Sequence, residues 1–153
     1  MPSHPMSDEE VLAFLTAEPA HTGKLATVGA DGRPHVAPIW FVVDTAAIGE
    51  GAPVGDLVFN TGADTRKGQH LRRDPRVSLC VDDERRPFSF VIIEGVATIS
   101  EELSEVAHWA AVIGGRYMGA ERAEEYGRRN GVPGELLVRL RPAHVVAVAD
   151  VAS

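Results

Sequence analysis

Residues 22–44, TGKLATVGADGRPHVAPIWFVVD, are the segment that most constrains how this chain can fold. They contain two β-rich stretches joined at Ala30-Asp31-Gly32. A glycine beside an aspartate between two such stretches is a strong signal for a tight turn that connects antiparallel strands. The segment therefore predicts a β-hairpin, and with it a sheet that begins as an antiparallel pair.

Four further β-rich stretches follow the hairpin, and the last is bent at Pro142. They are LVFNT, RVSLCVDD, FSFVIIEGVATIS and ELLVRLRPAHVVAVADV, at residues 57–61, 76–83, 88–100 and 135–151. The Gly- and Pro-rich residues 45–56 separate the hairpin from the first of them as a loop. No regular alternation of strands and helices appears, so a parallel βαβ sheet is disfavoured. We expect a mainly β fold with peripheral helices: a closed, six-stranded antiparallel barrel.

Three helical segments are expected between these strands. Ser7 and Glu10 have the spacing of a capping box, which predicts a helix over residues 8–17 that ends before Pro19. Thr65 is placed to cap a second helix, which Asp74-Pro75 ends. Residues 102–129 are expected to be helical with an interruption at GGRYMGA, residues 114–120.

The composition is that of a globular protein without a membrane span. A chain of 153 residues is expected to form one domain, residues 1–153. It has no apolar run near the ~20 residues that a membrane span needs, and MPSHPMSDEE is not a signal peptide. The single cysteine, Cys80, lies in an apolar run and is expected to be a buried structural thiol in a reducing compartment. We therefore expect a cytoplasmic protein.

Several kinds of catalytic site are not visible in the sequence. The six histidines are at least fourteen residues apart, so none has the local spacing of a zinc site. No P-loop, G-x-S-x-G turn or paired nucleophile and base is evident. We expect no metal site and no catalytic side chain, so an enzyme of this sequence would depend on a bound cofactor.

Residues 61–76, TGADTRKGQHLRRDPR, are the most unusual stretch of the chain. They hold five basic residues and two acids in a protein of net charge −7, which predicts an anionic partner. Nucleic acid is disfavoured because the chain has a pI near 5.3, only 6% aromatic residues and no known nucleic-acid motif. A solvated helix is the alternative for Arg72 and Arg73, whose stems would cover apolar surface.

The order of residues in this stretch favours a phosphate. A strand that ends at Asn60 and Thr61 leads through Gly62 to a helix start at Thr65. Such a turn offers hydroxyls, backbone N–H groups and the positive end of a helix to one anion. Lys67, in the first turn of the helix, adds a full positive charge.

The chain resembles the pyridoxamine 5'-phosphate oxidase-like split-barrel superfamily. Three stretches carry the resemblance over about residues 10–150, and K-x-x-x-L-R-R-D-P-R, Lys67 to Arg76, is its most specific element. Within the superfamily the sequence is most similar to the branch of oxidoreductases that use coenzyme F420. The arginine-rich FMN motif of the pyridoxamine-phosphate oxidases proper is missing, which lowers the expectation of FMN.

The resemblance implies a homodimer with cofactor sites at the subunit interface. The tricyclic ring would lie against the strand that contains Ala37, Pro38, Ile39 and Trp40. The phosphate would reach the next strand end and the following helix, and a partner subunit would cover the ring. The residues implied at the phosphate are Asn60, Thr61, Thr65, Arg66 and Lys67, and those implied on the partner side are Phe88, Ser89 and Phe90.

Several of these residues have a purely structural alternative. Trp40 and Phe41 point to opposite faces of a strand, so at most one faces the ring and either can be barrel core. Pro38 can mark a sheet edge or a bulge. Asn60 can stabilise the turn that follows it. The Lys67 side chain is the strongest of the predicted cofactor contacts.

The sequence therefore predicts an F420-dependent oxidoreductase that transfers a hydride from the reduced deazaflavin to a small organic acceptor. The alternatives are an FMN-binding oxidoreductase of the same fold and a non-catalytic protein that binds a flavin or deazaflavin. The expected partners are the acceptor and a second copy of the chain, with neither nucleic acid nor membrane.

Overall fold

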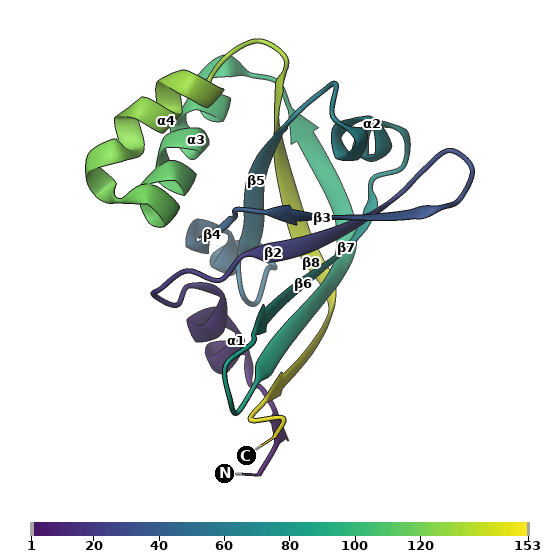
Figure 1. Ribbon diagram of the computed structural model, residues 1–153, viewed down its shortest axis with the longest axis vertical. Helices are drawn as coiled ribbons and strands as arrows, with labels where there is room; N and C mark the ends of the chain where they lie inside the picture. Colours follow the sequence, from purple (N-terminus) through teal and green to yellow (C-terminus); the bar gives the residue numbers. More distant parts are fainter. Residues whose placement is uncertain (1, 153) are drawn as a thin grey trace.

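One antiparallel sheet of eight strands forms the body of the computed structural model, which describes residues 2–152 (Figure 1). The strands follow the order β3-β2-β6-β7-β8-β5-β4, and the short β1 pairs with β8. Their bounds are β1 His4–Pro5, β2 Gly23–Val28, β3 Pro34–Ile39, β4 Val42–Asp44, β5 Asp56–Gly62, β6 Arg76–Asp83, β7 Ser89–Ser100 and β8 Glu135–Ala149. The mainly β, antiparallel fold with helices is confirmed.

The expected number of six strands is wrong, and so is the expected closure. The predicted second strand divides at Trp40-Phe41: β3 pairs with β2, whereas β4 pairs with β5 at the other end of the sheet. β3 and β4 lie at the two ends of the strand order and are not paired by hydrogen bonds. Trp40 and Phe41 connect them along the backbone. β1, only two residues long, is the other strand that the sequence did not indicate.

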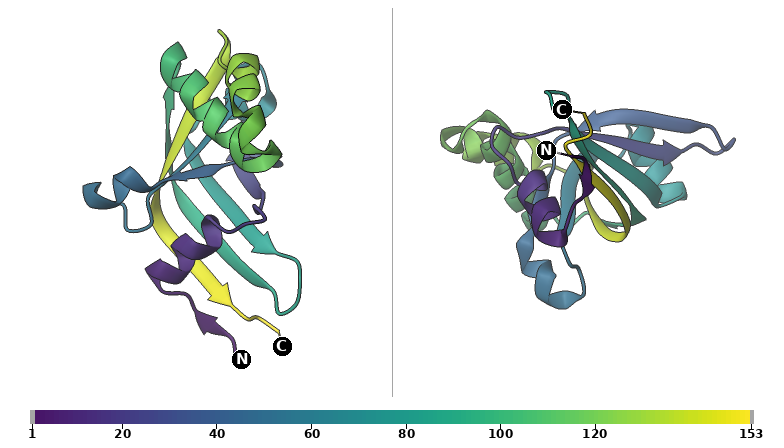
Figure 2. Two further views of the ribbon diagram at one scale, coloured as in Figure 1. Left: turned by 90° about the vertical axis from the view of Figure 1, so that its left-hand side faces the viewer. Right: turned by 90° about the horizontal axis from the view of Figure 1, so that it is seen from below.

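The helices lie on the outside of the sheet (Figures 1 and 2). They are α1 Asp8–Leu15, α2 Arg66–Arg73, α3 Leu103–Met118 and α4 Ala123–Asn130, with short 3-10 turns η1 Thr45–Glu50 and η2 Ala120–Arg122. The predicted capping box of α1 is confirmed, because Glu10 N donates to Ser7 Oγ at 3.1 Å and Ser7 N to Glu10 Oε1 at 3.1 Å. The helical break lies at Gly119, at the end of the predicted interruption, where φ is +104°.

The core lies inside the curved sheet and is closed by α1. Its large side chains are fully buried, and they include Phe41, Phe59, Leu25, Leu57, Leu79, Ile93, Leu136 and Leu140. A second, smaller cluster joins α3 to the outer face of β4, β5 and β8 through Val42, Val58, Val106, Ile113 and Leu137. Figure 2 shows α3 and α4 side by side on one flank, with the β2–β3 hairpin extending away from them.

Two smaller expectations concern β8 and Cys80. The bend of β8 is confirmed, since its register with β7 shifts where Glu94 and Gly95 face His144 and Pro142. Cys80 on β6 is only partly buried, and burial raises the pKa of its thiol. No helix in residues 2–152 is long and apolar enough to cross a membrane.

Helix α2 packs unusually close to the end of β5. A methyl group on Gly68 would overlap the Gly62 carbonyl oxygen, so the helix approaches the strand backbone only because residue 68 is glycine. Thr65 caps the helix as predicted: its hydroxyl accepts from Gly68 N at 3.1 Å and donates to Gly62 O at 2.7 Å. These contacts fix the direction in which the first turn of α2 points.

We predict that Gly68→Ala destabilises the protein although alanine favours helices by ~1 kcal/mol over glycine. The added methyl meets backbone on β5, and overpacking of this kind costs ~1–3 kcal/mol. Urea unfolding should give a lower midpoint for Gly68→Ala than for Gly49→Ala, where an added methyl meets no atom within 4 Å. Equal midpoints for the two variants would contradict the close contact between α2 and β5.

Candidate functional site

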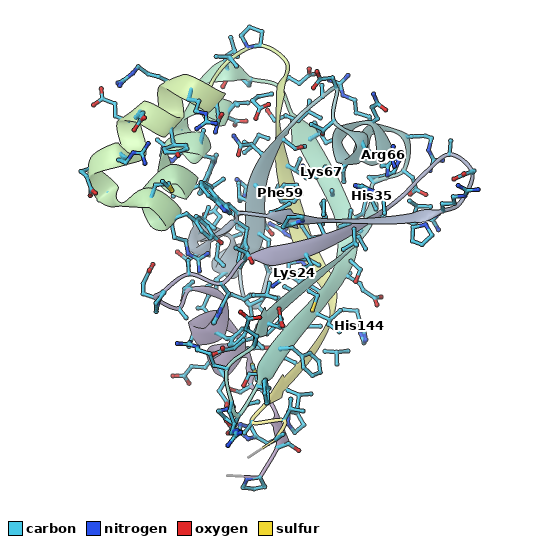
Figure 3. The ribbon with its side chains drawn as sticks, viewed as in Figure 1. Lys24, His35, Phe59, Arg66, Lys67 and His144 are labelled. Atoms are coloured by element: carbon cyan, nitrogen blue, oxygen red, sulfur yellow. The ribbon has the colours of Figure 1, made fainter. Side chains whose placement is uncertain are left out.

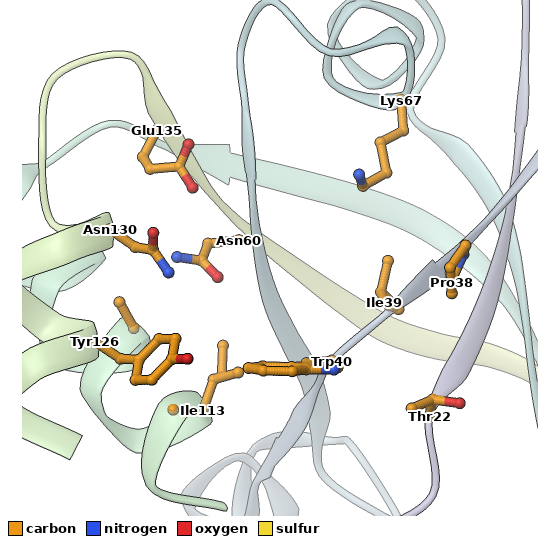
Figure 4. Close-up of a pocket in the computed structure, with 12 residues that line it drawn as sticks. Thr22, Pro38, Ile39, Trp40, Asn60, Lys67, Ile113, Tyr126, Asn130 and Glu135 are labelled. Atoms are coloured by element: carbon orange, nitrogen blue, oxygen red, sulfur yellow. The ribbon is translucent and has the colours of Figure 1, made fainter. Parts of the chain in front are cut away.

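A cavity of about 310 Å³ lies between β3, the start of α2 and the α3–α4 pair (Figure 4). Its apolar wall is formed by Pro38, Ile39 and Trp40 on one side and by Ala110, Ile113 and Gly114 on the other. Its remaining lining residues are Thr22, Asn60, Lys67, Tyr126, Asn130 and Glu135. A largely apolar cavity with a few convergent polar groups is the usual form of a small-molecule site.

Three polar groups that line the cavity lack a partner within the described chain. The buried Nδ2 of Asn60 makes no hydrogen bond. Lys67 and Glu135 take part in none of the ion pairs formed within residues 2–152. A buried polar atom is nearly always satisfied, so the unpartnered Asn60 Nδ2, beside the half-buried Lys67 and Glu135, indicates a ligand in this cavity.

The Glu135 carboxyl has an altered acidity. Burial raises its pKa above that of an ordinary glutamate, the Lys67 ammonium acts in the opposite direction, and the charge of Asp64 adds to the rise. Glu135 begins β8 opposite Gly62 of β5, while Lys67 projects from α2 toward the other side of the cavity (Figure 4). The cavity thus holds a cation and an acid on facing walls.

The two threonines of the predicted phosphate site are engaged in the backbone turn. Thr61 is 4% exposed, and its hydroxyl lies 3.0 Å from that of Thr65. Since the Thr65 proton is directed to the Gly62 carbonyl, the Thr61 hydroxyl donates to Thr65. Neither residue lines the cavity. Both therefore hold the start of α2 in place, and Lys67 is the residue of this turn that reaches into the cavity.

β3 presents a free edge at the cavity, because it pairs only with β2. Pro38 lies on this edge strand, the position where proline is tolerated in a sheet. The backbone of Ala37 and Ile39 belongs to the same strand. An edge strand leaves N–H and C=O groups without a strand partner, and these are available to a flat ligand.

The side chains of Trp40 and Phe41 point to opposite faces, as strand geometry predicts. Phe41 is fully buried, whereas Trp40 is 39% exposed and stacks on Tyr117 with ring centroids 5.0 Å apart. Helix α3 fixes this link: Arg116 donates to Phe41 O at 2.6 Å, and Tyr117 accepts from Phe41 N at 3.3 Å. The aromatic floor of the cavity is thereby held by α3.

Three of the four arginines in residues 61–76 form ion pairs or hydrogen bonds within the protein. Arg72 pairs with Glu101 at 2.7 Å, and Arg76 pairs with Asp74 at 2.7 Å, which lowers the pKa of Asp74 to about 2. Both arginines are therefore paired with acids of the same chain. Arg73 is exposed, as expected, but it also donates to Val28 O and Gly29 O at 2.7 and 2.6 Å and so ties α2 to the β2–β3 hairpin.

Arg66 lines a second cavity, of about 480 Å³, between α2 and the β2–β3 hairpin. Arg33, His35 and His70 line it as well. Arg66 and Lys67 are neighbours in sequence, yet they line different cavities; Figure 3 labels both, together with His35. Because Pro34 and His35 border this cavity while Pro38 to Trp40 border the first, the two cavities follow each other along β3.

The structure brings five of the twelve predicted residues to one cavity: Pro38, Ile39, Trp40, Asn60 and Lys67. Phe88 lies in the β6–β7 connection and Ser89 begins β7, at the opposite end of the sheet from α2 (Figure 1). They were predicted to act from a partner subunit, and that prediction stays a prediction.

Sequence reasoning missed the half of the cavity that the last third of the chain provides. Tyr126 and Asn130 of α4 and Glu135 of β8 were not predicted, nor were the apolar residues of α3. Glu135 had one signal, as the acid that opens the apolar stretch ELLV. The α3 and α4 residues had none, because helical periodicity does not tell where a helix pair packs.

Comparison with known proteins gives a family and a fold. The Pyridoxamine 5'-phosphate oxidase family matches residues 7–149. Among solved structures, the conserved hypothetical protein Rv2991 from Mycobacterium tuberculosis is 29% identical with a TM-score of 0.76, over 93% of this chain and 84% of that one. No curated protein matches.

Two further structures share the fold at lower identity. An F420 reductase is 23% identical with a TM-score of 0.60, over 82% of this chain and 88% of its own. The heme storage protein HutZ from Vibrio cholerae is 24% identical with a TM-score of 0.66, over 91% and 93% of the two chains. At these identities the likeness concerns the fold alone.

Proposed function

Because the chain belongs to the pyridoxamine 5'-phosphate oxidase family, we propose that it is an oxidoreductase that binds coenzyme F420. When bound in its reduced form, this deazaflavin supplies a hydride to a small organic acceptor. The observation that carries the proposal is the convergence of unpaired Lys67 and the buried, unpartnered Asn60 Nδ2 on a cavity walled by Pro38 to Trp40.

The residues of the cavity fit such a cofactor. The free edge of β3 offers backbone hydrogen bonds to the ring, and Pro38, Ile39 and Trp40 offer it an apolar wall. Lys67 gives a charge-assisted contact to the phosphate, with the start of α2 nearby. The protein's part is to bind and orient the cofactor and to keep water away from one of its faces.

The second cavity favours F420 over FMN. Both cofactors carry a ring, a ribityl chain and a phosphate, so Lys67 alone does not choose between them. F420 continues beyond the phosphate into a tail of several carboxylates. Arg66, which forms no ion pair within residues 2–152, lines a cavity that follows the first along β3, where such a tail would find compensating charge. Arg33 lines it as well and pairs there with the exposed Asp31 at 3.3 Å.

We also propose a homodimer that covers an apolar face of the sheet. Val96 is 56% exposed and Val146 43%, on the neighbouring strands β7 and β8. A cavity of about 520 Å³ at the same strands is lined by Val77, Val96 and Ala143 among others. Exposed apolar surface of this kind marks an interface.

For the dimer, light scattering at micromolar concentration should give about twice the chain mass of 16.4 kDa. Val96→Lys with Val146→Lys places charge in the apolar face and should shift the protein toward monomer. The same pair of substitutions at exposed Val112 and Val132, outside that face, serves as the control. A wild-type monomer that binds the cofactor tightly would contradict an interface that contributes to the site.

For the phosphate anchor, Lys67→Ala should weaken F420 binding roughly 10- to 150-fold, since a hydrogen bond to a charged group contributes ~1.5–3 kcal/mol. Fluorescence titration measures this. Arg72→Ala is the matched control, because it removes one positive charge from the same helix outside the cavity. Its affinity should stay within about fivefold of wild type, since an exposed pair is worth ~0–1 kcal/mol. Equal losses in both variants would indicate diffuse charge instead of an anchor.

For the choice of cofactor, the preference for F420 over FMN should be largest at low salt. The dissociation constants of F420 and FMN, measured from ~0.02 to ~0.5 M salt, should become more similar as the salt concentration rises. The reason is that screening weakens the tail contacts of F420 more than the single phosphate contact that both cofactors make. Arg33→Ala with Arg66→Ala should remove most of this salt dependence while leaving FMN affinity nearly unchanged. Tighter binding of FMN throughout the range would make FMN the cofactor.

A further inference from the structure

Glu135 is the feature of the cavity that the binding of a cofactor phosphate does not explain. It is the one carboxylic acid among the lining residues of the described chain, and it faces the cavity without an ion-pair partner there. A structural carboxylate at the end of a strand would be expected either to pair with the nearby Lys67 or to point into solvent. A carboxyl that remains unpaired beside an anion site tends to keep its proton.

We propose that the Glu135 carboxyl is the acid that protonates the acceptor, with Asn60 Nδ2 as the donor that holds the acceptor's carbonyl oxygen. This inference rests on the proposed function and adds the two protein groups that complete the reaction. It concerns an acceptor with a carbon–carbon double bond conjugated to a carbonyl group.

The surroundings of Glu135 favour its protonated form. The charged groups that face it are Lys67 of α2 and Asp64 in the loop before α2; α4 contributes Tyr126 and Asn130, and β5 contributes Asn60. Lys67 is the one group that favours the carboxylate. A phosphate on Lys67 offsets that positive charge and adds negative charge nearby. Binding of the cofactor phosphate at Lys67 therefore raises the pKa of Glu135 further.

The step balances with these groups. Hydride addition to the β-carbon of the acceptor moves the double-bond electrons toward the carbonyl oxygen, where Asn60 Nδ2 donates a hydrogen bond. The O–H bond of Glu135 then breaks, the proton bonds to the α-carbon, and the carboxyl oxygen keeps the electron pair. The acceptor gains two electrons, the reduced deazaflavin loses them, and Glu135 recovers its proton from water.

The decisive variant is Glu135→Gln, which keeps the shape and removes the acid. Single-turnover oxidation of bound reduced F420 by cyclohex-2-enone should slow ~10²- to 10⁴-fold, the usual contribution of a general acid. Glu135→Asp should recover part of the rate. Glu124→Gln, at an exposed position of α4, is the control and should behave as wild type.

The affinity of F420 gives a readout that does not depend on turnover. Since an anion on Lys67 raises the pKa of Glu135 further, F420 binding by wild type should weaken as pH rises through that pKa. Each unit by which the bound cofactor shifts this pKa gives a tenfold change in dissociation constant. In Glu135→Gln this contribution should vanish, so the ratio of the two dissociation constants should change between pH 5.5 and 8.5.

The outcomes separate the two claims. Failure of wild type to bind F420 overturns the proposed function and this inference with it. Binding with a constant affinity ratio across pH, or equal hydride-transfer rates in wild type and Glu135→Gln, overturns the role of Glu135 and leaves the cofactor assignment standing. A pH-dependent ratio together with a slow Glu135→Gln that Glu135→Asp partly restores supports the inference.

Discussion

The close packing of α2 on β5 is the contact on which the candidate site depends. The Gly68 backbone lies against the Gly62 carbonyl, and the Thr65 hydroxyl bridges the same two residues. A side chain at position 68 would push the helix outward, and Lys67 one residue earlier would move with it. The position of a cation in the cavity is thus set by a glycine and a threonine that need not touch the ligand.

The position of the opposite wall of the cavity depends in a similar way on contacts from α3. Arg116 donates to the carbonyls of Phe41 and Leu15, and the Tyr117 hydroxyl donates to the His21 carbonyl at 2.6 Å. These bonds hold the link between β3 and β4, where Trp40 stacks on Tyr117. Gly114 allows α4 to approach α3, since a methyl group there would overlap Tyr126. The aromatic floor and the polar side of α4 are therefore positioned together.

Local signals in the sequence were enough for most elements and for the place of Lys67 at the candidate site. The turn at Asp31-Gly32, the capping box of α1, the Thr65 cap and the bend at Pro142 all depend on neighbouring residues, and all are found in the structure. Lys67 was predicted for the same reason, because a short turn joins its helix to β5.

The features that sequence reasoning missed depend on contacts between distant residues. The break at Trp40-Phe41 occurs because β4 pairs with β5, a choice that no residue near position 40 reveals. The pairing of Arg72 with Glu101 likewise joins residues far apart in the chain. Glu135 reaches the cavity through the register of β8 on β5, so its place in the cavity became visible only in three dimensions.

A crystal structure of the protein with F420 tests the central claim most directly. The account predicts the ring along Pro38 to Trp40 and a phosphate oxygen about 2.7–2.9 Å from Lys67 Nζ, the usual length of a charge-assisted bond. It also predicts carboxylates of the tail beside Arg33 and Arg66. A cofactor bound elsewhere, with Lys67 facing solvent, would contradict the account.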